Sequence, residues 1–178
     1  MPEPCSDSLG PLRKEFEDVN ASVGFFGKIP WDGLLAIRNF VGSTPILSVG
    51  AGQAINESFL KKLGTQMTAT DIEPSPGSGE VQRLDAVSAV KAHPECTALY
   101  FSWPPYGDSM AADALRAHNE LVGSFPQKVV YVGEGLGGCT GDDAFHHLLD
   151  EHYLVAQVIE CIHFEDVKDA VFLYSLRA

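Results

Sequence analysis

A buried-strand pattern that ends in glycines constrains this chain more than any other feature. Residues 46–49, Ile-Leu-Ser-Val, form the short apolar run that parallel sheets bury on both faces. Gly50 and Gly52 follow at once, and a helical pattern runs over residues 55–63. Glycine lets the backbone turn sharply and lets a ligand approach without a Cβ in the way. A strand, a glycine turn and a helix in this order predict an α/β fold with a ligand site at the turn.

The rest of the chain from Pro45 continues this alternation. Residues 73–80 are rich in Pro and Gly and cannot form a helix, so we expect a loop there. Two final strands, near 153–162 and 169–176, are joined by a link too short for a parallel crossover, so they must be antiparallel. The pattern predicts one open, mostly parallel sheet. Its other expected elements are strands at 66–70, 81–84, 97–101 and 128–132, and helices at 86–92, at 109–122 capped by Asp108, and at 143–149 after a capping box at Thr140.

Because the alternation of strands and helices begins at Pro45, we expect residues 1–44 to form a separate N-terminal extension. We expect disorder over residues 1–8 and helices near 9–20 and 31–42. Phe25 and Phe26 lie between these helices in a glycine-flanked loop. This aromatic pair is either a lid over the site or an anchor that pins the extension to the core.

The composition narrows the function classes. The chain has 178 residues, enough for one α/β domain, and its formal net charge is -12. Such a surface disfavours nucleic acid and anionic membranes as partners, and it fits a neutral or cationic small molecule, although solubility alone also explains it. The four cysteines show no C-x-x-C pair, and the sequence has neither a signal peptide nor a membrane-spanning run. We therefore expect a cytoplasmic protein; the sequence leaves its oligomeric state open.

Four further residues distinguish a dinucleotide site from a nucleoside site. The dinucleotide fingerprint needs a third small residue where this chain has the branched Ile55, whereas the small residue here is Ala54. Asp71 ends the second strand, where it can accept hydrogen bonds from ribose hydroxyls, and Asp85 ends the third, where it can accept from an adenine amino group. Each acid alone could equally be a solvated loop residue or a helix cap. Together with the turn they favour a nucleoside site over a pyrophosphate site.

With these motifs, residues 45–178 resemble the class I S-adenosylmethionine-dependent methyltransferases, with a Rossmann-like fold. The resemblance implies a seven-stranded sheet of order 3-2-1-4-5-7-6 and S-adenosylmethionine as the cofactor. The chain differs from the family pattern at two positions of the glycine motif. Ala54 replaces the third glycine, and Ser48 replaces the acidic residue that is usual near the start of the motif. The helix after Asp71 is also missing. The cofactor-binding residues that it implies are Ser48, Gly50, Ala51, Gly52, Asp71, Ile72, Asp85, Ala86 and Ser102.

The fourth expected strand ends in a motif that resembles the acceptor motif of amino-methylating members of this family. Residues 102–106 read Ser-Trp-Pro-Pro-Tyr, but Trp103 stands where those members place a hydrogen-bonding side chain. Adenine-N6 chemistry is therefore not carried over. A rigid Pro-Pro turn remains, and Trp103, Pro104 and Tyr106 are candidates to bind a planar or cationic acceptor by stacking and cation–π contact. The alternative is a turn with two packed aromatics.

A glycine-rich stretch, residues 133–142, follows the fifth expected strand. Glu134 is the candidate there for a substrate contact or general base, and Tyr106 is the second candidate catalytic residue. His147 and Glu151 share a helical face without a third ligand at useful spacing, so no metal is expected.

The expected reaction is direct, in-line methyl transfer to a small molecule, with positioning as the main contribution of the protein. A protein methyltransferase, a non-catalytic partner subunit with this fold and, disfavoured by Ile55, a nucleotide-dependent oxidoreductase remain alternatives.

Overall fold

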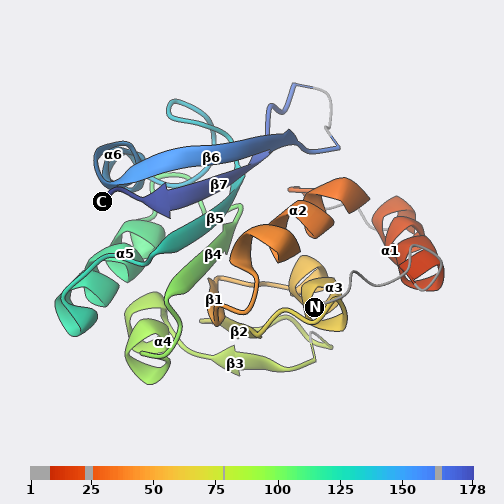
Figure 1. Ribbon diagram of the computed structural model, residues 1–178, viewed down its shortest axis with the longest axis horizontal. Helices are drawn as coiled ribbons and strands as arrows, with labels where there is room; N and C mark the ends of the chain where they lie inside the picture. Colours follow the sequence, from red (N-terminus) through yellow and green to blue (C-terminus); the bar gives the residue numbers. More distant parts are fainter. Residues whose placement is uncertain (1–8, 23–25, 78, 163–165) are drawn as a thin grey trace.

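A computed structural model describes residues 9–22, 26–77, 79–162 and 166–178 of the chain. Its centre is a single seven-stranded sheet (Figure 1). The strands are β1 (Ile46–Val49), β2 (Met67–Asp71), β3 (Val81–Arg83), β4 (Ala98–Ser102), β5 (Lys128–Gly133), β6 (Tyr153–Glu160) and β7 (Ala170–Leu176). The helices are α1 (Gly10–Ser22), α2 (Trp31–Val41), α3 (Ile55–Lys62), α4 (Ala86–Ala92), α5 (Met110–Val122) and α6 (Asp143–His152).

The strand order is β3-β2-β1-β4-β5-β7-β6, which confirms the predicted topology. Strands β1 to β5 pair in parallel, and β7 pairs antiparallel with both β5 and β6. The short link between β6 and β7 explains the antiparallel pair, because a parallel crossover needs a dozen or more residues. The carboxyl ends of β1, β2 and β4 therefore meet at one edge of the sheet, beside the glycine turn.

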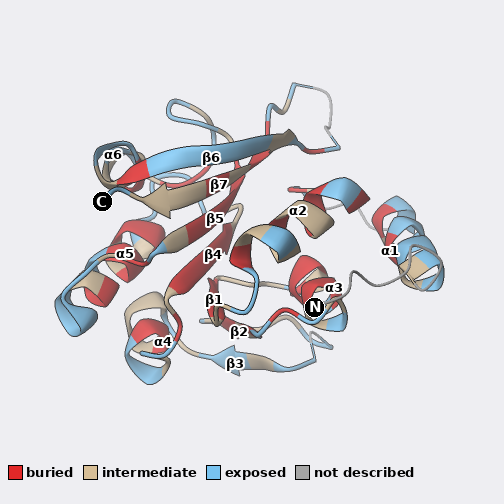
Figure 2. Ribbon diagram, in the orientation of Figure 1, coloured by how far each residue is buried: buried red, intermediate tan, exposed pale blue. Residues whose placement is uncertain are grey.

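Two apolar cores lie on opposite faces of the sheet. Helices α1, α2 and α3 contribute Phe16, Leu34 and Leu60 to one core, and the other contains Leu115 of α5 and Phe145 of α6. The central strand β1 is buried along its whole length, because successive side chains point into alternate cores (Figure 2). This is why three of its four residues are apolar, and the fourth, Ser48, is buried as well. No helix among the described residues is long and apolar enough to cross a membrane.

Two helix caps differ from the sequence prediction. The N-cap position of α5 is held by Ser109, which makes no side-chain capping hydrogen bond, whereas the carboxylate of Asp108, one residue earlier, accepts from the Met110 N–H at 2.8 Å. The cap of α6 is Asp142, whose side chain accepts from Phe145 N, and not Thr140. Asp, Ser and Thr are all favourable at the N-cap position. Where several of them are neighbours in sequence, the predicted start of the helix can be wrong by a residue or two.

Three other predictions concern segments that lie partly or wholly outside the described residues. The loop predicted over 73–80 contains no helix in its described part, residues 73–77 and 79–80. The expected disorder of residues 1–8 and the position of Phe25 lie outside the described residues.

Candidate cofactor and acceptor site

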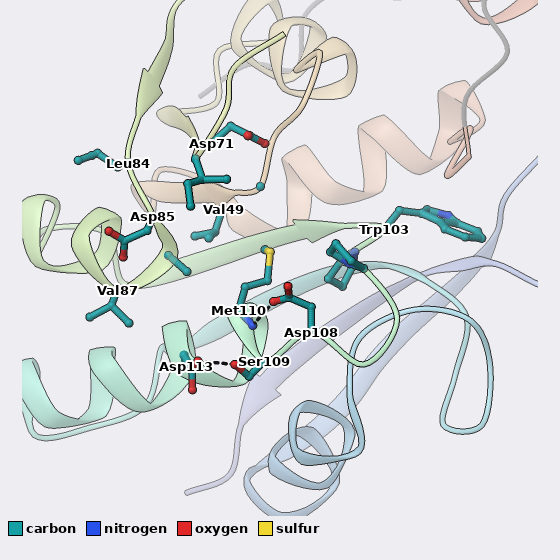
Figure 3. A pocket seen from close by; sticks show the side chains of 15 residues that line it. Val49, Asp71, Leu84, Asp85, Val87, Trp103, Asp108, Ser109, Met110 and Asp113 are labelled. Atoms are coloured by element: carbon teal, nitrogen blue, oxygen red, sulfur yellow. Dashed lines mark hydrogen bonds between the residues drawn. The ribbon is translucent and has the colours of Figure 1, made fainter.

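A cleft of about 440 Å³ opens at the carboxyl edge of the sheet, between the glycine turn, the start of α4 and the start of α5 (Figure 3). Its walls come from the ends of β1, β2 and β4 and from the segments that follow β3 and β4. The lining residues are Val49, Gly50, Asp71, Ile72, Leu84, Asp85, Ala86, Val87, Trp103, Pro104, Pro105, Asp108, Ser109, Met110 and Asp113.

The glycine turn is a left-handed bend that Asp71 holds from the next strand. Gly50 and Gly52 have φ values of 73° and 55°, which cost a glycine little, and Ala54 adopts 52°. Asp71 Oδ2 accepts from the Gly52 N–H at 2.8 Å, and Oδ1 accepts from the Glu73 N–H at 2.7 Å. An ionised carboxylate has about four acceptor sites, so these two bonds leave Asp71 able to accept from a ligand as well.

Asp85 has a structural role that coexists with its place in the cleft. It caps α4, accepting from Ser88 N at 2.9 Å and from Ser88 Oγ at 2.6 Å. These hydrogen bonds from Ser88 lower the pKa of the Asp85 carboxyl, which therefore stays ionised near neutral pH. An ionised carboxylate is an acceptor only, suited to an amino group.

The cleft is electronegative. Asp71, Asp85, Asp108 and Asp113 all line it, and none of the described residues that line it is a lysine or an arginine. A phosphate-bearing ligand would meet repulsion there, whereas a cationic ligand would be attracted. Sequence reasoning placed Asp108 only as a helix cap and missed Asp113, which comes from the first turn of α5.

Met110 projects into the cleft from the start of α5. Its side chain extends across the space toward the glycine turn, with Asp71, Leu84 and Asp85 on one side and Trp103 on the other (Figure 3). A Cβ added at Gly50 would lie 2.8 Å from Met110 Cε. Glycine at position 50 therefore permits the close approach of this thioether as well as the turn.

Ser48 lies beneath the turn rather than in the cleft. It is fully buried, and its hydroxyl donates to Glu57 Oε1 of α3 at 2.7 Å. Glu57 is itself buried, and burial raises the pKa of its carboxyl to about 7. Sequence reasoning missed Glu57, since an acid on an amphipathic helix gives no signal that it points inward.

Trp103 lines the cleft, but its indole points away from the acids (Figure 3). Its backbone adopts φ 51°, its N–H donates to Val132 O at 2.8 Å, and its indole Nε1 donates to Asp169 Oδ2 at 3.1 Å. The ring of Phe26 stacks on the indole, with centroids 4.5 Å apart. Tyr106 is 77 % exposed and does not line the cleft.

Glu134 anchors its own glycine-rich loop. Its carboxylate accepts from the Cys139 N–H at 2.8 Å and from the Lys168 N–H at 3.0 Å. These two backbone N–H groups, Lys168 first, lower the pKa of the Glu134 carboxyl. Glu134 thus ties the loop after β5 to the segment before β7, outside the cleft lining. No group of three or more His, Cys, Asp or Glu side chains in the described part of the chain could hold a metal ion.

The structure brings about half of the predicted site residues together. Those in the cleft lining are Gly50, Asp71, Ile72, Asp85, Ala86, Trp103 and Pro104; those outside it are Ser48, Ala51, Gly52, Ser102, Tyr106 and Glu134.

Several solved structures share this fold. An N1-methyltransferase of 1,6-didemethyltoxoflavin from Burkholderia thailandensis, with that compound and S-adenosylhomocysteine bound, is 14% identical; the match covers 100% of this chain and 93% of that one, with a TM-score of 0.59. The N-methyltransferase NodS from Bradyrhizobium japonicum, in complex with S-adenosylhomocysteine, is 13% identical over 93% of this chain and 98% of that one, also with a TM-score of 0.59.

A putative tRNA (m1A22) methyltransferase from Streptococcus pneumoniae, in complex with S-adenosylmethionine, has the same fold. It is 13% identical, and the match covers 80% of this chain and 71% of that one, with a TM-score of 0.53. No protein-family model and no curated protein sequence matches the chain. The chain therefore has the fold of the class I methyltransferases, and acceptors as different as a small heterocycle and tRNA occur in the names of its structural neighbours.

Proposed function

We propose that this chain is an S-adenosylmethionine-dependent methyltransferase that acts on a small planar acceptor. The observation that carries the proposal is the acidic cleft at the carboxyl edge of the sheet, beside a glycine turn that Asp71 holds. Its residues fit a nucleoside with a positive charge and no phosphate, because four aspartates line the cleft and its described lining residues include no cationic side chain.

Each wall of the cleft has a part in this proposal. Asp71 accepts hydrogen bonds from the ribose hydroxyls, Asp85 accepts from the adenine amino group, and Ile72 and Leu84 flank the base. When bound, S-adenosylmethionine supplies a methyl group on a positively charged sulfur that a nucleophile can displace. The cleft acids favour that charge, and the segment from Trp103 to Pro105 closes the acceptor end.

The negative net charge of the chain supports a small molecule as the acceptor. The formal net charge of -12 disfavours binding of a phosphate backbone. The test is methyl transfer from labelled S-adenosylmethionine to a panel of small heterocyclic amines, phenols and thiols, with tRNA and a histidine- and lysine-rich peptide as comparison acceptors. Transfer to tRNA or peptide alone would overturn the small-molecule assignment.

One observation favours a second candidate, a non-catalytic subunit with this fold. The Trp103 indole is engaged by Asp169 and Phe26, so the altered acceptor motif presents no free ring to the cleft. Tight S-adenosylhomocysteine binding without turnover on any acceptor, together with co-purification of a second chain, would support this candidate over the enzyme.

A further inference from the structure

The edge of the sheet at β6 has no partner strand on its outer side. β6 is the last strand in the order of the sheet and pairs with β7 alone. The backbone N–H and C=O groups that point outward from its eight residues therefore meet no further strand in the described part of the chain. Apart from the buried Tyr153 and the partly buried Ile159, every residue of β6 is exposed (Figure 2). An edge of this kind can accept another strand.

The side chains of β6 are apolar on both faces of the sheet. Leu154, Val155 and Val158 are each slightly more than half exposed. Val155 and Val158 pair with Tyr174 and Phe172 of β7 and share their face, which is the face that α6 packs against. Leu154 points to the other face. A strand at the edge of an antiparallel pair ordinarily places polar side chains toward water, so two apolar faces indicate a surface that is covered by a partner.

β6 also lacks most of the features that keep edge strands apart. Natural edges are commonly protected by charged side chains, by proline or by short length. Residues 153–159, Tyr-Leu-Val-Ala-Gln-Val-Ile, contain neither a charged residue nor a proline. A register shift between Val155 and Gln157 is a bulge, which limits pairing locally, but the pairing from Gln157 to Glu160 is regular. The second half of the strand is therefore free to form a ladder on its outer side.

The partner that fits this edge best is a second copy of the chain. The opposite edge of the sheet, β3, has only three residues, and Gln82 and Arg83 among them are exposed and polar, so it offers little to pair with β6. The long edge that a second copy supplies is its own β6. Antiparallel pairing of two β6 strands about a two-fold axis is self-complementary, and it closes because each long edge is then used.

Charge points to the same contact. The chain has a formal net charge of -12, so two copies repel each other on average. Like charges that lie directly opposite each other across a strand pair are destabilising. Because residues 153–159 carry no charge, pairing through this stretch places no like charges of the strand opposite each other.

We propose that two copies of this chain associate by antiparallel pairing of their β6 strands, which joins the two sheets into one. The pairing satisfies the outer backbone groups of both edges and covers Leu154, Val155 and Val158 of each copy. Eight residues a side are fewer than the roughly 20–30 of a standard interface, so the dimer is reversible. The inference does not depend on the proposed methyltransferase function, because no residue of β6 lines the cleft.

The first test is sedimentation velocity over a concentration range of roughly 1 μM to 1 mM. We expect a shift from monomer to dimer for the unsubstituted protein. V158K places two like charges within the strand pair and should weaken association by roughly tenfold or more. V158T keeps the branched shape without a charge and should retain association within a few-fold. V122K is the matched control, since it adds the same charge at an exposed valine of α5.

Hydrogen exchange identifies the strand that pairs. The amides of β6 should exchange more slowly as the protein concentration rises, whereas those of α1 should not change. Added salt should strengthen the dimer, because it screens the repulsion between two negative chains while the contact itself contains no ion pair.

A chain that stays monomeric over the whole range, or a dimer whose β6 amides exchange equally fast at every concentration, would overturn the proposal. A dimer that V158K and V122K weaken equally, or that salt weakens, would overturn it as well. Thermal unfolding shows whether V158K is folded; if it is not, L154K on the opposite face takes its place. The exchange and salt measurements need no substitution.

Discussion

The Ser48 hydroxyl donates to Glu57 Oε1 over 2.7 Å, with both side chains buried beneath the glycine turn. Burial raises the pKa of Glu57 from 4.5 to about 7, with nearby Asp71 adding to the rise and Ser48 and Lys61 opposing it. The folded chain therefore holds a proton between these two pH values that the unfolded chain has lost. Stability should fall as pH rises from 4.5 to about 7, by roughly 3 kcal/mol from this group alone.

The measurement is urea unfolding across this pH range for the unsubstituted protein and for E57Q. Glutamine has nearly the same shape and does not titrate, so the E57Q profile should lack this fall. Parallel profiles for the two proteins would contradict the assignment of the buried proton to Glu57.

D85N separates the two roles of Asp85. Asparagine is as good a helix cap as aspartate, so the melting temperature of D85N should stay close to that of the unsubstituted protein. Its amide nitrogen cannot accept from an adenine amino group, so we expect roughly tenfold weaker S-adenosylhomocysteine binding. Thermal unfolding and calorimetry measure both quantities, and an affinity that does not change would remove Asp85 from the adenine site.

Alanine at the two turn glycines should have unequal effects. Both positions have positive φ, which costs a Cβ-bearing residue about 1–2 kcal/mol. At Gly50 the new Cβ also meets Met110 Cε, whereas a Cβ at Gly52 meets nothing within 4 Å. G50A should therefore weaken cofactor binding more than G52A, and M110A added to G50A should recover only that difference.

The strands of the sheet could be predicted because each is indicated by a local sequence pattern. Much of the site could not be predicted, because it depends on contacts between residues that are far apart in sequence. The apolar run of β1 and the short link between β6 and β7 each determine their own structure, and the strand order then brings Asp71 and Asp85 to one edge. The pair Trp103 and Asp169 is 66 residues apart in sequence, and no periodicity relates them.

The acceptor motif was harder to interpret for a backbone reason. The sequence left Trp103 either as a stacking residue for an acceptor or as a packed aromatic of a turn, and its left-handed backbone turns the indole away from the cleft acids. Glu57 and Asp169 gave no signal because burial of a single acid depends on tertiary packing that composition does not reveal.

Glu134 remains a prediction as a general base, and E134Q tests it. Both of its oxygens accept from backbone N–H groups and its pKa is lowered, which favours an anchoring role. For an anchor, E134Q should increase protease cleavage near residues 134–139 and leave the shape of the pH–rate profile unchanged. Loss of the acidic limb of that profile in E134Q would instead establish catalysis by Glu134.

The most direct test of the central claim is a calorimetric titration of S-adenosylmethionine, S-adenosylhomocysteine and NAD into the protein and into D71A. We predict saturable binding of both sulfur compounds, at least tenfold weaker binding in D71A because the ribose acceptor and the Gly52 anchor are lost together, and no binding of NAD. Binding of NAD alone, or no heat with either sulfur compound, would contradict the account.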